Sequence, residues 1–116
     1  MSAVLKDQPR LGTMGAGDLD EVIVIERAVY SHPWTRGNFT DSFNAGYHCR
    51  TYRIGAELVG YFVLIVAVGD AHLLNLSVSA AHQRQGAGSV LLTEAMRLAR
   101  EDMVRLLFPR DRKSVV

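Results

Sequence analysis

The residues best suited to chemistry form one short loop, Gln83-Arg84-Gln85-Gly86-Ala87-Gly88, between an apolar segment and a long amphipathic one. The apolar segment, Leu73 to Val78, predicts a β-strand, and the segment after the loop predicts a helix. The first turn of a helix carries unpaired backbone N–H groups and partial positive charge, which suit an anion such as a diphosphate. Gly86 and Gly88 leave room for a ligand to approach these amides, and Arg84 adds a positive charge. The loop therefore predicts a phosphate-binding turn.

Two common nucleotide-binding motifs do not fit this loop. A dinucleotide fingerprint needs a third glycine, and Leu91 stands in its place; a Walker loop needs a lysine, and none is near. The pattern that fits is Gln/Arg-x-x-Gly-x-Gly, at Gln83, Gly86 and Gly88. Between a strand and a helix, this pattern resembles the acetyl-CoA loop of the GCN5-related N-acetyltransferases, the GNAT superfamily. The alternative is a glycine turn that only caps the helix.

The resemblance implies that acetyl-CoA is the co-substrate and that backbone groups hold it. In this family the fourth strand carries a bulge, which leaves ladder groups unpaired and directs them at the cofactor. Backbone groups of Leu76, Ser77 and Val78 would pair with the pantetheine arm, and the Val78 N–H would polarise the thioester carbonyl. The cofactor-binding residues of the loop and helix start would be Gln83, Arg84, Gln85, Gly86, Ala87, Gly88 and Ser89.

Further segments point to one branch of the family. LLNLSV, HQRQGAG and the segment from Ile25 to Phe39 resemble the ribosomal-protein-alanine N-acetyltransferases. In that subfamily the last segment borders the acceptor-peptide groove, so Tyr30 and Trp34 are candidate substrate contacts. Aromatic residues with a polar end favour interfaces. Core packing is the alternative, and it is the preferred role for Phe39 and Phe43. The resemblance implies acetyl transfer to a protein N-terminal α-amine, with a ribosomal protein as a candidate acceptor.

The elements that position these residues follow from the hydrophobic pattern. Asp18 to Glu21 has the form of a capping box before a helix that ends near Tyr30, and Thr35 caps a second helix. Strands are expected over residues 10–14, 47–54, 58–68 and 71–78. The long helix after the loop is expected to bury Leu91, Leu92, Ala95, Met96, Leu98 and Ala99. We therefore predict an α/β (α+β) domain, the N-terminal part of a GNAT fold. Its antiparallel β meander leads into a β-α-β unit that carries the acetyl-CoA loop.

The C-terminal residues depart from the family pattern. Met103 to Phe108 predicts a fifth strand, parallel to the fourth. Pro109 stands where the subfamily has its catalytic glutamate, and the helix with its catalytic tyrosine does not follow, so no catalytic residue is assigned. We expect one incomplete N-acetyltransferase domain over residues 1–110, inactive through truncation. Residues 111–116 back-translate to a sequencing-adapter sequence, which favours a non-native tail over a natural basic one.

Composition narrows the remaining classes. A net charge of +1 over 116 residues argues against a bulk nucleic-acid binder. The longest apolar run, Leu58 to Val68, is too short to cross a membrane, and the N-terminus lacks a signal-peptide core, so we expect a cytoplasmic protein. The single cysteine, Cys49, excludes a disulfide framework, and no metal site is assigned. His72 and His82 are expected at surface or turn positions, and Glu94 on a solvated face.

Two other function classes stay open at this point. One is a non-catalytic acyl-CoA-binding or dimerising half-domain, whose fifth strand would be an open edge for another chain. The other is a nucleotide-binding α/β protein, which the glycine count disfavours. Binding of acetyl-CoA compared with ATP and NAD separates the second class from the others.

Overall fold

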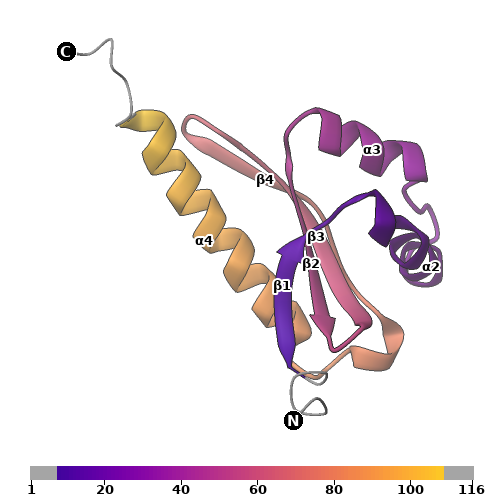
Figure 1. Cartoon of the computed structure of the whole chain (residues 1–116). Coiled ribbons are helices and arrows are strands. Elements are labelled where there is room, and N and C mark those ends of the chain that lie inside the picture. Colours follow the sequence, from indigo (N-terminus) through magenta and orange to yellow (C-terminus); the bar gives the residue numbers. More distant parts are fainter. Residues whose placement is uncertain (1–7, 109–116) are drawn as a thin grey trace.

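The computed structural model describes residues 8–108, which form a four-stranded antiparallel sheet with helices on both faces (Figure 1). The strand order β1-β2-β3-β4 follows the chain, as expected for a meander. The elements are β1 (Pro9–Thr13), the 3-10 turn η1 (Ala16–Asp18), α2 (Leu19–Val29), α3 (Arg36–Asn44), β2 (His48–Ile54), β3 (Glu57–Ala67), β4 (Asp70–Val78), the 3-10 turn η2 (Ala80–His82) and α4 (Ala87–Leu107).

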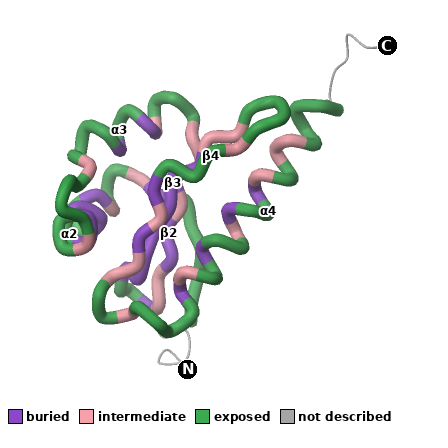
Figure 2. The backbone as a smooth tube through the Cα atoms, turned by 180° about the vertical axis from the view of Figure 1, so that it is seen from behind, coloured by how far each residue is buried: buried purple, intermediate pink, exposed green. Residues whose placement is uncertain are grey.

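The core lies on both faces of β3. Tyr61 and Val63 pack on the side of α2 and α3, whereas Phe62 and Leu64 pack on the side of α4. This two-residue alternation is what a pleated strand imposes on its side chains. Figure 2 shows the buried positions gathered along the central strands and the inner helix faces, while the C-terminal part of α4 is largely exposed.

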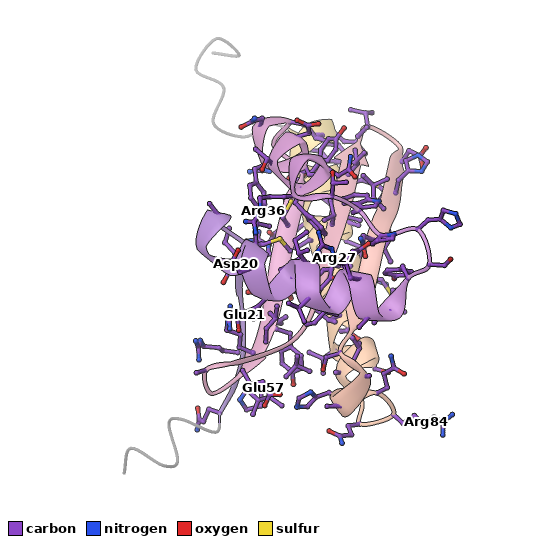
Figure 3. The ribbon with its side chains drawn as sticks, turned by 90° about the vertical axis from the view of Figure 1, so that its right-hand side faces the viewer. Asp20, Glu21, Arg27, Arg36, Glu57 and Arg84 are labelled. Atoms are coloured by element: carbon purple, nitrogen blue, oxygen red, sulfur yellow. The ribbon has the colours of Figure 1, made fainter. Side chains whose placement is uncertain are left out.

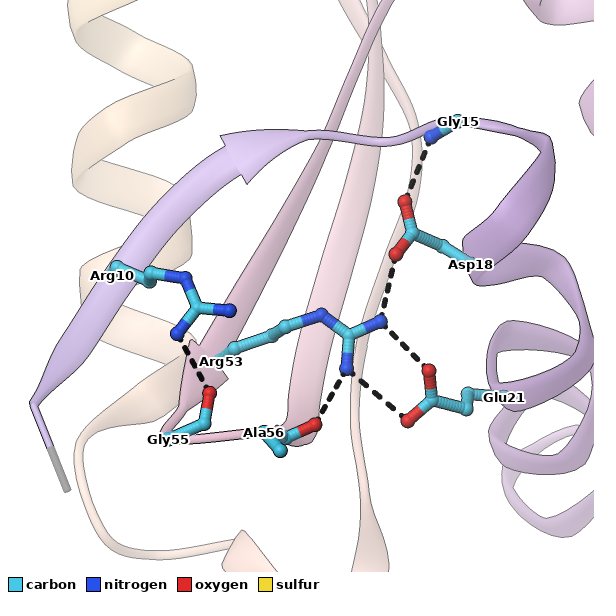
Figure 4. A network of polar contacts seen from close by, with 7 residues as sticks. All are labelled: Arg10, Gly15, Asp18, Glu21, Arg53, Gly55 and Ala56. Carbon is cyan, nitrogen blue, oxygen red and sulfur yellow. Dashed lines mark hydrogen bonds and ion pairs between the residues drawn. The ribbon is translucent and has the colours of Figure 1, made fainter. Parts of the chain in front are cut away.

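The two predicted helix starts differ in outcome. Thr35 caps α3 as expected: its hydroxyl accepts the Asn38 N–H at 3.2 Å, and the Asn38 side chain accepts the Thr35 N–H at 2.9 Å. The capping box predicted at Asp18 and Glu21 is wrong, because Asp18 makes no side-chain cap to α2. Both carboxylates instead bind the Arg53 guanidinium of β2, each at 2.7 Å (Figure 4). A bidentate ion pair across the fold outcompetes the local bond to the helix.

The predicted fifth strand is also wrong. Residues 103–107 continue α4, and Phe108 ends it. Within residues 8–108 the unit after β4 is therefore β-α and not β-α-β. Asp102 explains part of the difference, since its carboxylate binds both His48 of β2, at 2.8 Å, and Arg105 one turn ahead. A short apolar run fits the periodicity of a helix as well as that of a strand, and here these ion pairs favour the helix. Pro109 and the predicted tail over residues 111–116 lie outside the described residues.

Helix α4 buries a narrower face than the sequence predicts. Ala87, Leu91, Ala95 and Leu98 are buried against β3 and β4, and Ala99 is partly buried. Leu92 and Met96, expected in the core, are 46% and 45% exposed. The two alanines allow the helix to lie close to the sheet, so only the stripe centred on them faces inward.

Candidate functional site

The turn from β4 into α4 is held by a contact to β3 and by bonds within the turn itself. β4 ends at Val78, and the Ser79 N–H donates to the Val59 carbonyl of β3 at 2.8 Å. The Ser79 hydroxyl lies 2.8 Å from the His82 ring, which places His82 in the structure of the turn, as expected. The segment reaches Gly86 as the N-cap of α4, in the left-handed conformation with φ 86°. Glycine adopts this conformation without steric cost, so the position requires it.

The first amides of α4 are available to a ligand. The first backbone bond of the helix runs from the Val90 N–H to the Gly86 carbonyl at 3.1 Å. No acceptor among residues 8–108 receives the N–H groups of Ala87, Gly88 or Ser89. They form the positive end of a 21-residue helix, which attracts an anion.

Arg84 lies on the open side of this turn. Its side chain extends away from the body of the molecule (Figure 3), and its backbone has a φ of 66°. A positive φ is uncommon for a residue other than glycine and marks a sharply bent turn. Gln83 closes the base of the turn, because its side-chain amide donates to the Val78 carbonyl at 3.2 Å. Gln85 and Ala87 are the remaining loop residues of the predicted site.

Near the end of β4, successive residues direct their backbone N–H and C=O groups to opposite edges of the strand. The bond between Ser79 and Val59 marks a hydrogen-bonded pair of the β3–β4 ladder. Such pairs alternate with non-bonded ones along an antiparallel ladder, so the backbone groups of Leu76 and Val78 point to the open edge and those of Ser77 point to β3. The edge that would meet the pantetheine arm thus presents alternate residues, including the Val78 N–H.

A bulge lies just upstream of this edge. Leu64 pairs with Leu73 and Val63 pairs with Asn75, so Leu74 has no partner on β3. The extra residue bends β4 and resets which of its groups point outward. The family resemblance implies such a bulge in the fourth strand, and the structure places it two residues before Leu76.

Tyr30 connects the predicted acceptor side to this edge. Its hydroxyl donates to the Leu76 carbonyl at 2.8 Å and accepts from the Ser77 hydroxyl at 3.0 Å. Trp34 is more enclosed: it is partly buried, with its ring centroid 5.1 Å from that of Phe39. Phe39 is fully buried and Phe43 packs on the same cluster, so the core role expected for both is confirmed.

Two determinants of the site are not evident from motif reading. The first is Gly60 of β3, where an added Cβ would lie 2.5 Å from the Ser77 carbonyl and 2.8 Å from the Leu91 side chain. Glycine is therefore needed for the close approach of β3, β4 and α4 beneath the turn. An isolated glycine inside an apolar strand pattern is the signal that could have indicated this.

The second determinant is Glu26, a carboxylate that is 1% exposed. It accepts hydrogen bonds from the Tyr61 hydroxyl at 2.7 Å and from the backbone N–H of Trp34 at 2.9 Å. Burial, together with the bond to Glu26, raises the pKa of the Tyr61 hydroxyl well above its usual range. The sequence signal for this network is a glutamate within the apolar face of a predicted helix. Such a glutamate is expected to be buried, and a buried carboxylate needs hydrogen-bond partners.

Other reactive groups show no catalytic arrangement in the described part of the chain. Burial raises the pKa of the Cys49 thiol to about 11, which keeps it neutral. Glu94 has a pKa below its usual range because Arg97 binds it at 2.8 Å, an ion pair on the helix surface. His72 is exposed and bonds to Asp70 at 2.8 Å.

Two features are absent from residues 8–108. No three His, Cys, Asp or Glu side chains gather there as a metal site would require. None of the helices in that range combines the length and apolar character needed to cross a membrane.

The combination of loop, edge strand and helix start is matched by one family model. The model of the Acetyltransferase (GNAT) family aligns with residues 19–110, most of the chain. The chain belongs to the GNAT family. The match includes α2, the whole β2–β4 meander, the glycine turn and α4.

Two curated relatives of this GNAT protein carry the name of the same kind of enzyme. A Bacillus subtilis (strain 168) protein, provisionally named a [ribosomal protein bS18]-alanine N-acetyltransferase, is 26% identical over 105 residues, covering 89% of this chain and 70% of the relative. The [ribosomal protein bS18]-alanine N-acetyltransferase of Haemophilus ducreyi (strain 35000HP / ATCC 700724) is 29% identical over 76 residues, covering 66% of this chain and 52% of the relative.

Solved structures support the same fold. The ribosomal-protein-S18-alanine N-acetyltransferase of Escherichia coli superposes with a TM-score of 0.74 at 21% identity, covering 82% of this chain and 61% of that structure. At this identity the match shows the fold. Structures that share the fold include a complex with coenzyme A. This GNAT chain thus spans about six tenths of the length of the E. coli structure.

The described residues suit the diphosphate of coenzyme A. The amides of Ala87, Gly88 and Ser89 are unpaired within the described chain. An added Cβ at Gly86 would meet no protein atom within 4 Å, so the space beside the turn is open. Donors at a helix start with open space beside them match a phosphate group.

Proposed function

We propose that this chain is part of an N-acetyltransferase that transfers the acetyl group of acetyl-CoA to the N-terminal α-amine of a protein, of the ribosomal-protein-alanine type. Two features together carry the proposal. The first N–H groups of α4 have no acceptor in the described chain, and β4, which leads into α4, is an edge strand of the described sheet. Membership of the GNAT family and the bS18-alanine N-acetyltransferase relatives support it. A cytoplasmic location, a ribosomal acceptor and the lack of nucleic-acid or membrane partners belong to the same proposal.

Each part of the site has a distinct task in this proposal. Acetyl-CoA, when bound, supplies the acetyl group as a thioester. The amides of residues 84–89 hold its diphosphate, and the outward backbone groups of Leu76 and Val78 align its arm along β4. The Val78 N–H donates to the thioester carbonyl as negative charge develops there. Holding both reactants at one strand edge replaces a bimolecular encounter with a local one.

The acceptor amine must lose a proton before it attacks, because an α-amino group has a reference pKa of about 8. The family resemblance implies a glutamate base, where this chain has Pro109, and a tyrosine acid in the part of the relatives that this chain does not match. Pro109, at the glutamate position, lies outside the described residues. We therefore expect the chain by itself to bind acetyl-CoA without detectable turnover.

Ligand-induced thermal stabilisation tests the binding step. A ligand that binds only the folded state raises the melting temperature in proportion to the logarithm of its concentration. We expect acetyl-CoA and CoA to raise it, and ATP or NAD at the same concentration to leave it unchanged. Stabilisation by NAD or ATP alone would instead support a nucleotide-binding protein. Turnover of an alanine-starting peptide by this chain would contradict the assigned need for the family's glutamate and tyrosine.

A second function, an acyl-CoA-binding half-domain that associates with another chain, is favoured by one observation. The C-terminal part of α4 exposes Val104, Leu107 and Phe108 at 57%, 52% and 66%, and β4 is an edge strand of the described sheet. Unpartnered strand edges and apolar helix faces promote association. Equilibrium sedimentation with and without CoA separates the two functions: a monomer at all concentrations excludes the second.

A further inference from the structure

Arg50 of β2 is a partly buried cation on the α4 side of the sheet. Its neighbour on β3 is Phe62, which belongs to the core cluster of α4, so the two side chains share that face. On β1 the register pairs Arg50 with Thr13. The adjacent pair is hydrogen-bonded, since the Met14 N–H donates to the Cys49 carbonyl at 2.8 Å. Arg50 and Thr13 are thus a non-hydrogen-bonded pair, whose side chains approach each other closely.

Most donor groups of Arg50 have no acceptor in the described chain. Nη1 donates to the Thr13 hydroxyl at 2.7 Å, and Nη2 makes no bond within residues 8–108. Nε is fully buried without a partner, the only such side-chain nitrogen or oxygen among those residues. A buried donor that lacks an acceptor is costly and calls for a specific explanation. The two unused groups, Nε and Nη2, lie on the same edge of the guanidinium.

The charge of Arg50 is also uncompensated by direct contact. None of the ion pairs among residues 8–108 includes it. Glu94 of α4 faces the same space, but Arg97 holds its carboxylate through Nε at 2.9 Å and Nη2 at 2.8 Å. The bond to Arg97 is accordingly the main cause that lowers the pKa of Glu94, and the charge of Arg50 adds least to it.

These side chains line an open pocket of about 220 Å³ between β1, β2 and α4. Two guanidinium groups and one carboxylate contribute to the lining, which leaves one net positive charge. The Thr13 hydroxyl accepts from Arg50, so its own hydrogen is available to another acceptor. The volume exceeds that of several water molecules, which is enough for a phosphate or carboxylate group. The lining residues are Leu11, Gly12, Thr13, Arg50, Glu94 and Arg97.

We propose that this pocket binds a small oxyanion, a phosphate or a carboxylate, on the Nε–Nη2 edge of Arg50. Such an edge presents two parallel N–H groups that match two oxygens of the anion, and this bidentate pairing is strong. The anion approaches from Nη2, because Nε is enclosed by the protein. It then gives Nε an acceptor, compensates the charge of Arg50 and accepts a third bond from the Thr13 hydroxyl.

The pocket is separate from the cofactor turn. The turn offers the backbone amides of residues 87–89, whereas the pocket meets α4 at Glu94 and Arg97. This is about two helical turns, or roughly 10 Å, further along the helix. The pocket also binds through side chains rather than through backbone groups. The inference therefore goes beyond the proposed function and does not depend on acetyl-CoA. A bound oxyanion would connect β1 and β2 to the middle of α4.

NMR spectroscopy of the isotope-labelled full chain observes the two places separately. The chain is titrated with sodium phosphate, with sodium acetate, and with sodium chloride at the same ionic strength as the control for screening. The Nε–H signal of Arg50 is assigned by its loss in Arg50→Lys. We expect phosphate or acetate, but not chloride, to shift this signal and that of Thr13 in a saturable way. Saturation by phosphate alone identifies a phosphate site, and saturation by acetate identifies a carboxylate site. Shifts confined to the amides of residues 87–89, or an unmoved Arg50 signal, overturn the inference.

Substitutions on α4 test the pocket without altering Arg50. Glu94→Gln removes the negative charge that faces the anion and releases Arg97, so the anion should bind about threefold more tightly or better. Glu101→Gln is the matched control, because Glu101 also bonds to Arg97, at 3.3 Å, but does not line the pocket. It should bind the anion within about twofold of the unaltered chain. Equal affinities of these two variants contradict the pocket as the site.

Arg50→Lys tests the geometry of the edge, since lysine keeps the charge but lacks the two parallel N–H groups. We expect the affinity for the anion to fall about tenfold, measured from the Thr13 signal. An unchanged affinity in a folded Arg50→Lys would show that charge alone holds the anion and would overturn the bidentate role of Arg50. If Arg50→Lys does not fold, the comparison of Glu94→Gln with Glu101→Gln still decides whether the pocket is the site.

Discussion

The cofactor turn and the hydrogen-bond network around Glu26 are built in opposite ways. The turn uses contiguous residues, Gln83 to Ser89, and offers backbone N–H groups. The network uses groups separated by up to 49 residues in the chain, as between Glu26 and Asn75. Backbone donors recur in any helix start with a suitable glycine, so a motif can identify them. Side chains from four elements converge only in the folded molecule.

This difference also separates how the two regions respond to substitution. Side chains around the turn can change with little effect on the amides, provided that the backbone conformation is kept. In the network, each polar group is a partner of another, and removal of one leaves a buried polar group unpaired. Gly60 lies under both regions, because it sets the distance between β3, β4 and α4. Five substitutions, with their controls, test the turn, the network and the helix that packs beside them.

Gly60→Ala should have the largest effect. Its Cβ would lie 2.5 Å from the backbone oxygen of Ser77, which cannot move without shifting β4. We expect a loss of about 3 kcal/mol in the free energy of unfolding, measured in urea. Gly17→Ala, where no atom lies within 4 Å of the added carbon, is the control and should be nearly neutral. A stable Gly60→Ala would mean that the seam under the site is looser than described.

Tyr61→Phe should come next, since it removes the 2.7 Å bond to the buried Glu26 carboxylate. Loss of one donor to a buried acceptor costs about 1–3 kcal/mol. Tyr52→Phe is a matched control, because Tyr52 is also buried but its hydroxyl makes no bond within residues 8–108. Urea unfolding of both variants measures the difference, and equal losses would show that the network adds nothing to packing.

Gly86→Ala tests the turn rather than the network. At φ 86° an alanine costs about 1–2 kcal/mol, so the melting temperature should fall moderately. Gly88→Ala should leave stability unchanged or slightly raised, since its Cβ meets only the Val78 side chain at 3.9 Å. Both should weaken CoA binding, as judged by thermal stabilisation. If Gly88→Ala binds CoA normally, the ligand does not approach the helix start at that residue.

Asp102→Asn should have the smallest effect, and one that depends on pH. Burial raises the pKa of Asp102, but hydrogen bonds from His48 and Arg105 outweigh it, so the folded pKa is below the usual range. The stabilisation is therefore present above the unfolded pKa of about 4 and is lost as the pH falls through the folded value. At pH 7 we expect a loss of about 0.5–1 kcal/mol that disappears in acid. A loss independent of pH would point to packing.

The elements around the site show where sequence patterns succeed. The strand and hairpin segments, the two N-terminal helices and the Thr35 cap all follow from local pattern, and the structure confirms them. The family membership suggested by Gln83, Gly86 and Gly88 is confirmed by the match over residues 19–110. The roles of the individual cofactor-binding residues stay predictions, now with a geometry that allows them.

The errors share a cause, which is competition from residues far along the chain. Asp18 and Glu21 leave the helix start for Arg53, and Asp102 holds residues 103–107 in the helix through His48. Leu92 and Met96 are exposed because the close contact of Ala87 and Ala95 with the sheet turns them outward. Local pattern contains none of these distant partners.

The amino-acid sequence alone determined the family, the order of the elements and the turn that would hold a phosphorylated carrier. These depend on backbone geometry and on periodicity, which neighbouring residues set among themselves. Only the tertiary structure decided which edge of β4 is open, that Gly60 permits the close layers, and that Glu26 is buried among donors from three other elements. Those properties arise from distances between residues that the chain separates, and no local rule contains them.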